Sequence, residues 1–148
     1  MAKPTRRKPA TVAESISKGH IGLPRGWSTG RLQGFIIGVL RAGHKRWPIK
    51  IQVKNGAKTE RRINPASGRM AQFYLCSSCQ GEFLNHEVEV DHILPVVDPT
   101  VGFVDWDTFI SRLFSPEENY QLLCQGCHKA KTNAEKKLKK ERKANESS

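Results

Sequence analysis

Two Cys-x-x-Cys motifs restrict the fold of this chain more than any other feature: Cys76 with Cys79, and Cys124 with Cys127. A CxxC turn places two sulfurs on one side of a tetrahedral ion, so two such turns complete a four-sulfur shell. The start of the chain lacks the apolar segment of a signal peptide, which makes secreted-type disulfides the weaker interpretation. We therefore expect a structural zinc ion that ties two distant segments together.

Two other uses of CxxC fit less well. Redox motifs of the thioredoxin type occur singly within a βαβ unit, and no such pattern surrounds these cysteines. Zinc nucleobase deaminases need His-x-Glu, whereas His86-Glu87 places the acid one position early. Deaminases also need a water on zinc, and four cysteines leave no position for it.

Charge is distributed unevenly along the 148 residues, whose formal net charge is +11. Residues 1–70 carry a net charge of +14, residues 71–128 one of −8, and residues 129–148 one of +5. A polyanionic partner, most simply double-stranded DNA, is expected to bind the basic arms, while the acidic middle is suited to cations. The alternative is that the arms are solvated tails, and we expect disorder from Met1 to about Ala13.

The length suits one small domain with basic extensions. The longest apolar run, Gly34–Leu40, is far shorter than the roughly 20 residues of a membrane span. We expect a cytoplasmic protein without membrane contact.

Hydrophobic spacing predicts an α+β fold. Apolar residues recur at helical spacing from Leu32 to Leu40, and Gly43 closes that helix. Alternation from Pro48 to Val53, followed by Asn55-Gly56, favours a strand whose hairpin partner would be Thr59–Ile63.

The second half of the chain gives clearer signals. Alternating residues predict a strand from Val88 to Pro95, and an apolar face predicts a helix over Asp105–Phe114. A short strand over Tyr120–Leu123 and a Lys- and Ala-rich helix from Cys124 to about Ala144 follow. The last helix would thus begin at the metal ligands.

Between the CxxC motifs lie Asp91-His92 and Asn119, and His128 directly follows the second motif. Hydrolysis of a phosphodiester needs a base to activate water and a hard cation to neutralise charge. Asp91 and His128 offer ligands for Mg²⁺ or Mn²⁺, and His92, on the other face of the strand, would take the water proton.

Three segments carry a family resemblance: Glu89–Pro95, Glu118–Cys124 and Cys127–Thr132. Together they resemble the motif of HNH endonucleases, over about Cys76 to Thr132. The resemblance implies a ββα-metal (His-Me finger) nuclease core, here stapled by zinc, with Asp91 and His128 as ligands of the catalytic ion and His92 as general base. It implies an orienting role, rather than a ligating one, for Asn119.

The resemblance divides the chain into a basic DNA-binding extension (1–70), an HNH nuclease domain (71–134) and a basic C-terminal helix or tail (135–148). It implies a hydrolase that nicks DNA, leaving a 5′-phosphate and a 3′-hydroxyl, as a monomer or weak dimer. The chain is also similar to small HNH proteins of tailed bacteriophages, which implies a homing or packaging role, phage packaging proteins as partners and the host cytoplasm as location. The predicted DNA-contacting residues are Lys45, Arg46, Arg61, Arg62, Arg69, Lys129 and Lys131.

A non-enzymatic zinc-ribbon module that binds DNA is the main alternative, although it gives no reason for Asp91-His92 and His128. Other histidines are interpreted more simply: His20 and His44 as exposed or DNA-facing, and His86 as a loop residue near the site. We expect Trp27, Trp47 and Trp106 to pack in a small core rather than to stack on bases.

Overall fold

The computed structural model describes residues 12–148, and the expected disorder from Met1 to Ala13 falls outside that range except for its last two positions. The chain divides into two compact units, Met1–Ala42 and Gly43–Ser148. The fold is mixed α and β, as expected, and it contains two small antiparallel sheets. Its compact second unit begins at Gly43, so residues 43–70 fold together with the residues predicted to form the nuclease domain.

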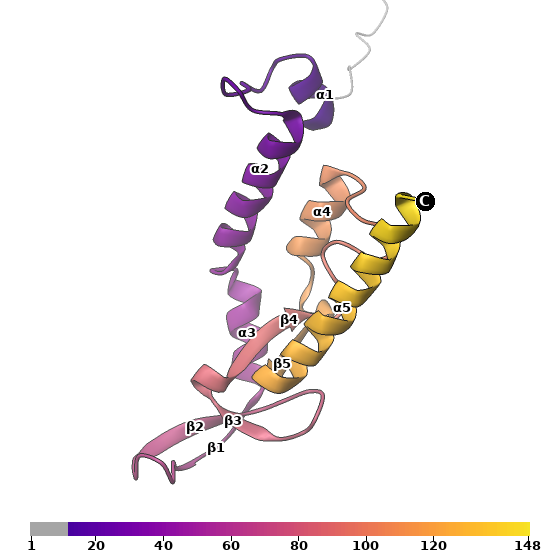
Figure 1. The fold of residues 1–148 in the computed structure, drawn as a ribbon. Helices are drawn as coiled ribbons and strands as arrows, with labels where there is room; N and C mark the ends of the chain where they lie inside the picture. Colours follow the sequence, from indigo (N-terminus) through magenta and orange to yellow (C-terminus); the bar gives the residue numbers. More distant parts are fainter. Residues whose placement is uncertain (1–11) are drawn as a thin grey trace, which may run out of the picture. The chain divides into compact units, whose positions relative to one another are not determined.

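The first unit holds α1 (Val12–Ser17) and most of α2 (Thr29–His44), shown in Figure 1. The helix predicted between Leu32 and Gly43 is confirmed. Ser28 caps α2, because its Oγ accepts a hydrogen bond from the backbone N–H of Arg31 at 3.1 Å. The Arg31 guanidinium lies 4.6 Å from the centre of the Trp27 ring.

In the second unit, the strand predicted over Pro48–Val53 is wrong, because these residues form α3 (Pro48–Gly56). Ile49, Ile51 and Val53 fit the period of two of a strand, but Ile49 and Val53 also lie on one face of a helix. Pro48 lies in the first helical turn, where its fixed φ suits a helix and its missing N–H costs nothing. As a helix, the segment turns Ile49 and Val53 partly inward and leaves Ile51 59% exposed.

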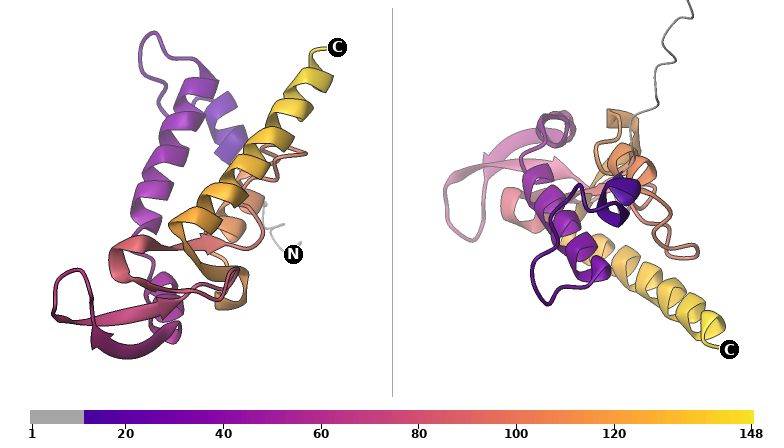
Figure 2. Two further views of the ribbon diagram at one scale, coloured as in Figure 1. Left: turned by 60° about the horizontal axis from the view of Figure 1, so that its bottom comes forward. Right: turned by 90° about the horizontal axis from the view of Figure 1, so that it is seen from above.

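The strand predicted over Thr59–Ile63 is confirmed as β1 (Lys58–Ile63), but its partner is β2 (Met70–Leu75). β2 also pairs with β3 (Glu82–Leu84), which gives an antiparallel sheet of order β1-β2-β3. The turn Asn85–Glu87 then leads into the second sheet. Figure 2 shows the β1–β2 hairpin at the opposite end of this unit from the carboxyl end of α5.

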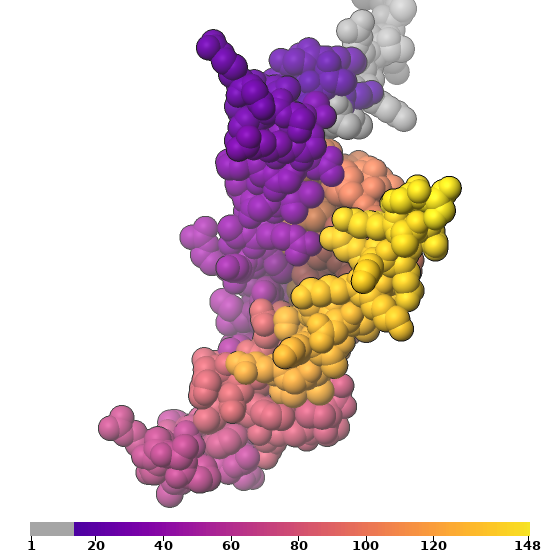
Figure 3. Space-filling model, viewed as in Figure 1, coloured from indigo at the N-terminus to yellow at the C-terminus, as the bar shows by residue number. Residues whose placement is uncertain are grey.

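The second sheet pairs β4 (Val88–His92) with β5 (Tyr120–Cys124), and α5 (Gln125–Glu146) follows at once. The predicted strand from Val88 is confirmed, although it ends at His92 rather than Pro95. The predicted last strand and helix are confirmed. Together the three elements follow the order β, long connection, β, α (Figure 1), and α5 runs along the surface of this unit (Figure 3).

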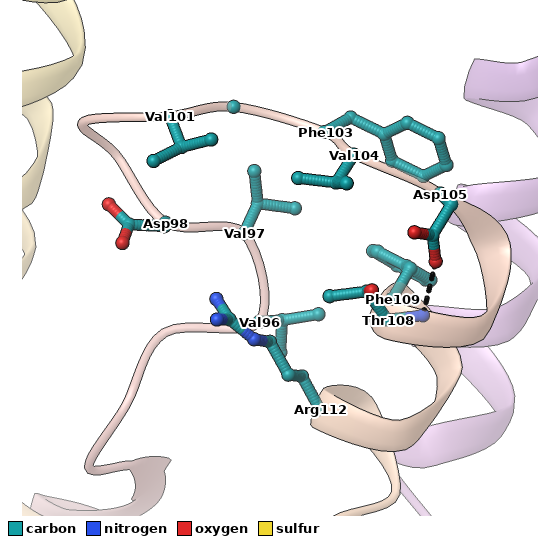
Figure 4. Close-up of a pocket in the computed structure, with 11 residues that line it drawn as sticks. Val96, Val97, Asp98, Val101, Phe103, Val104, Asp105, Thr108, Phe109 and Arg112 are labelled. Atoms are coloured by element: carbon teal, nitrogen blue, oxygen red, sulfur yellow. Dashed lines mark hydrogen bonds between the residues drawn. The ribbon is translucent and has the colours of Figure 1, made fainter.

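The long connection between β4 and β5 contains α4 (Trp106–Leu113) and the turn Glu117–Asn119. The Asp105 side chain caps α4, since its Oδ1 accepts from the Thr108 N–H at 2.6 Å. The residues before α4 fold back over it and form a small pocket of about 60 Å³, whose lining includes four valines, Phe103, Phe109 and Arg112 (Figure 4). The predicted helix is therefore confirmed, with Trp106, Phe109 and Leu113 buried and Ile110 exposed.

The core of the second unit lies between the sheets and their helices. Tyr74, Val88 and Leu122 form one buried cluster, and Cys76, Leu123 and Cys124 form another. Trp106 belongs to the core as expected, whereas Trp27 and Trp47 are only half-buried. None of the helices in residues 12–148 is long and apolar enough to cross a bilayer.

Candidate metal and catalytic site

The four cysteines meet, as the motif spacing predicts. Their Sγ atoms all lie within 4.8 Å of one another, and those of Cys79 and Cys124 are 3.9 Å apart. A zinc ion with four sulfurs at about 2.3 Å has sulfur–sulfur edges of about 3.8 Å. The arrangement therefore fits one tetrahedral zinc ion, which would join the β2–β3 turn to the start of α5.

Backbone N–H groups prepare this shell for a cation. Burial tends to raise the pKa of the Cys76 thiol, but hydrogen bonds from the N–H groups of Cys79 and Cys124 lower that pKa to about 6. The Cys124 N–H lies 3.3 Å from Cys76 Sγ. Cys124 is also the N-cap of α5, where its Sγ accepts from the Cys127 N–H at 3.4 Å. Cys76 is thus favoured as a thiolate, the form that binds zinc.

The β4–β5 pair has two chemically different faces. Glu89 and Asp91 share one face with Gln121 and Leu123, because directly paired residues of antiparallel strands point the same way. α5 covers this face and brings His128 and Lys131 to the two acids. Val90 and His92 lie on the other face.

His128 lies between two carboxylates. Its Nε2 is 4.0 Å from Asp91 Oδ1, and its Nδ1 is 3.5 Å from Glu89 Oε2. Two ligand atoms that each lie about 2.1 Å from one ion are at most about 4.2 Å apart. The separation of Asp91 and His128 lies near the upper end of this limit, and Glu89 lies on the other side of the imidazole.

Only two protein ligands meet at this place. Within residues 12–148, the four cysteines form the one group of three or more His, Cys, Asp or Glu side chains placed to share an ion. Mg²⁺ in nucleotide-processing sites is held by one or two protein groups, with waters and substrate phosphates completing its shell. A pair of ligands therefore suits a hard cation that binds together with a phosphate.

Lys131 lies on the same face, with Nζ 2.8 Å from Asp91 Oδ2 and in contact with Glu135. Burial tends to lower the pKa of Lys131, but hydrogen bonds to these two carboxylates raise it above its ordinary value. Lys131 was predicted to contact DNA. In the structure it is an ion-pair partner of a predicted metal ligand.

His92 is held by the backbone of α4. Its Nε2 lies 2.9 Å from the carbonyl oxygen of Leu113. A carbonyl oxygen only accepts, so Nε2 of His92 carries the hydrogen, and in the neutral ring Nδ1 carries the basic lone pair. The hydrogen bond thus fixes the tautomer that an acid–base residue needs.

Asn119 ties the two ends of the long connection together. Its Oδ1 accepts from the Leu94 N–H at 2.9 Å, and its Nδ2 donates to Ser115 Oγ at 3.1 Å. The backbone carbonyl of Asn119 also accepts from the Ile93 N–H at 2.7 Å. These bonds fix the chain directly after His92, and none of them uses the amide as a metal ligand.

The expectation that His44 is exposed or DNA-facing is wrong. Only 6% of its surface is exposed, and its ring stacks on that of His92, with centroids 5.1 Å apart and planes 24° apart. Glu89 also lies beside the site and was assigned no role from the sequence. Its position two residues before Asp91 on one strand places both side chains on the same face. No comparable signal in the sequence pointed to His44, because this residue lies far from the motif.

His86 lies in the turn Asn85–Glu87 and is exposed, as expected.

The predicted DNA-contacting residues fall into two groups. Lys131 and Arg62 have internal partners: Lys131 contacts Asp91 and Glu135, and Arg62 has its Nη1 2.8 Å from Glu82 Oε2 and its guanidinium 3.8 Å from the centre of the Phe73 ring. The other group consists of exposed residues at three places, the chain before α3, the β1–β2 hairpin and the start of α5: Lys45, Arg46, Arg61, Arg69 and Lys129.

Comparisons of this chain with models of protein families, with curated proteins and with solved structures give no match. The roles of these residues therefore rest on their own geometry and chemistry.

Proposed function

We propose that this chain is a metal-dependent endonuclease of the HNH type that nicks double-stranded DNA. The observation that carries the proposal is the β4–β5–α5 arrangement. It brings His128 Nε2 to 4.0 Å from Asp91 Oδ1, although the two residues are distant in sequence, and the next residue of the strand is His92, whose tautomer is fixed by the Leu113 carbonyl. A zinc-ribbon module without activity has no need of this combination.

Asp91 and His128 are the residues that would hold the catalytic Mg²⁺ or Mn²⁺. When bound, the ion neutralises charge on the scissile phosphate and on the leaving oxygen. Glu89 lies on the Nδ1 side of His128, 3.5 Å away, and its negative charge favours the ring orientation that turns Nε2 toward Asp91.

His92 acts as the general base. A water oxygen attacks phosphorus while Nδ1 of His92 takes a proton from that water, and the bond from phosphorus to the 3′ oxygen breaks. The electron pair leaves with the 3′ oxygen, which takes a proton from solvent. The products are a 5′-phosphate and a 3′-hydroxyl, and the proton on His92 then returns to solvent.

Exposed basic residues hold the DNA backbone. Arg61 and Arg69 on the hairpin, with Lys45, Arg46 and Lys129, supply positive charge to phosphates without sequence selectivity. Because each chain carries one such site, each binding event cuts one strand, and a double-strand break requires two chains.

Supercoiled plasmid tests this proposal. The wild type is incubated with Mg²⁺, Mn²⁺ or EDTA, beside Asp91→Asn and the matched control Asp107→Asn, which changes an exposed aspartate of α4. Zinc content is measured in each reaction, so that loss of the structural ion is distinguished from loss of the catalytic one. We expect metal-dependent nicking by the wild type and the control but not by Asp91→Asn. DNA retention without cleavage under any metal would instead identify a binding module.

A further inference from the structure

His44 lies next to the proposed base although it belongs to a different part of the chain. It is the last residue of α2, outside the Cys76–Thr132 segment that carries the motif. Its Nε2 lies 2.9 Å from the hydroxyl oxygen of Tyr120, and both residues are buried. A buried histidine with a specific polar partner restricts the positions of its neighbours.

The hydrogen bonds in this cluster have a defined direction. The Tyr120 hydroxyl donates to the Leu113 carbonyl at 2.8 Å, and the same carbonyl accepts from His92 Nε2 at 2.9 Å. The single Tyr120 proton is used in this bond, so His44 Nε2 is the donor to the Tyr120 oxygen. Burial raises the pKa of Tyr120, which keeps its hydroxyl protonated at neutral pH.

The rings also restrict one another. His92 stacks on His44, and its centroid lies 4.6 Å from that of Tyr120. Phe114 contacts the His44 ring edge-on at 5.5 Å. These contacts restrict the plane of the His92 imidazole, and within that plane the Leu113 carbonyl selects the ring orientation that places Nε2 toward it.

We propose that His44 is a positioning residue for His92, which it holds by stacking and through Tyr120, so that Nε2–H stays on the Leu113 carbonyl and Nδ1 stays the basic nitrogen. The catalytic part of this inference rests on the proposed function, but the orientation of the ring does not. Through His44, the segment before α3 contributes to the proposed catalytic site, although it lies outside the motif.

Three substitutions separate the two contacts. His44→Leu removes both the ring and the donor, His44→Gln keeps an N–H donor for Tyr120, and His44→Phe keeps a ring against His92. Nitrogen-15 NMR at pH 8, above the ordinary histidine pKa of about 6.5, reports the tautomer of His92 without any DNA. We expect the Nε2–H tautomer in the wild type, a mixture in His44→Leu and smaller changes in the other two variants. If His44→Leu does not fold, the partial variants must still differ from the wild type. The same His92 tautomer in every folded variant would overturn the proposal.

Nicking kinetics give the second measurement. Because a small misplacement of a reacting group costs on the order of 100-fold in rate, we expect His44→Leu to lower kcat by about 10- to 100-fold with KM for DNA unchanged. His44→Gln should recover part of this loss. An unchanged kcat in His44→Leu, or a rise in KM alone, would refute a positioning role. If the wild type does not cut DNA, the proposed function fails, and the tautomer measurement still decides whether His44 orients His92.

Discussion

Asp91 and His92 are adjacent in β4, yet they make contacts on opposite faces of the strand. Asp91 Oδ2 lies 2.8 Å from Lys131 Nζ of α5, whereas His92 Nε2 lies 2.9 Å from the Leu113 carbonyl. Both side chains can reach one phosphate only where the strand ends, immediately after His92. The scissile phosphate is therefore expected at the carboxyl end of β4, beside the loop that Asn119 fixes.

Loss of one cysteine should remove the structural ion. Structural zinc contributes an apparent 10–16 kcal/mol in small zinc-binding peptides, as much as the whole stability of a typical domain of about 5–15 kcal/mol. We expect Cys124→Ser to lose its zinc and the Gly43–Ser148 unit to unfold, as measured by metal analysis and circular dichroism. Ser77→Ala, in the same turn as Cys76 and Cys79, should change neither quantity, since Ser77 contributes a backbone bond to Leu122. A fully folded, zinc-free Cys124→Ser protein would contradict the structural role.

Lys131 should compete with a divalent cation for Asp91. A positive charge this close to the ligand opposes a second cation by about 1 kcal/mol or more. We therefore expect Lys131→Gln to tighten Mn²⁺ binding by about three- to tenfold, measured by electron paramagnetic resonance on zinc-loaded protein. Lys129→Gln removes an equal charge from an exposed position and should have a smaller effect. Weaker Mn²⁺ binding by Lys131→Gln would show that Lys131 supports the site instead.

Asn119 should affect stability and activity mainly by fixing the chain that follows His92. Asn119→Ala removes the acceptor for the Leu94 N–H and the donor to Ser115, and each such bond contributes about 0.5–1.5 kcal/mol. We expect thermal unfolding to show a loss of about 1–3 kcal/mol, together with slower nicking. Asn119→Asp keeps the acceptor and should be the milder change. Equal losses in the two variants would mean that the bond to Leu94 is unimportant.

The arginines of the hairpin should differ in their effects on DNA binding. Arg61→Ala and Arg69→Ala should each weaken binding and reduce the slope of log affinity against log salt by about 1, as expected when one phosphate contact is lost. Arg62 is held by Glu82 and Phe73, so Arg62→Ala should instead lower stability, by about 1 kcal/mol or less for a partly exposed pair. Fluorescence anisotropy over a salt series, with thermal unfolding alongside, separates these outcomes. An equal loss of affinity in all three variants would show that Arg62 also contacts phosphates.

The sequence correctly predicted the segments whose residue pattern is compatible with only one local structure. A CxxC turn places its two sulfurs in one way around a tetrahedral ion, and the alternation around Asp91 and His92 allows one register that turns Val88 and Val90 toward the core. These patterns correctly predicted β4, β5, the start of α5 and the meeting of the four cysteines.

The failures have an equally physical origin. Ile49 and Val53 fit a period of two and also one face of a helix, whereas Ile51 fits only the strand, and tertiary packing decided in favour of the helix. His44 was misassigned because its burial depends on Tyr120, Phe114 and His92, which come from distant segments. The residues next to His44 in the sequence do not indicate those contacts.

Single-turnover nicking by His92→Ala, compared with that by His86→Ala at saturating DNA and with zinc content verified, tests the role of His92. His86 is exposed, and its bond to Gln125 uses the backbone carbonyl, so the alanine variant retains that bond. Since a general base contributes about 10²- to 10⁴-fold, we expect a loss of that size in His92→Ala, with DNA binding retained and His86→Ala cutting like the wild type. Equal nicking by His92→Ala and the wild type would contradict the central claim that His92 is the base of this nuclease.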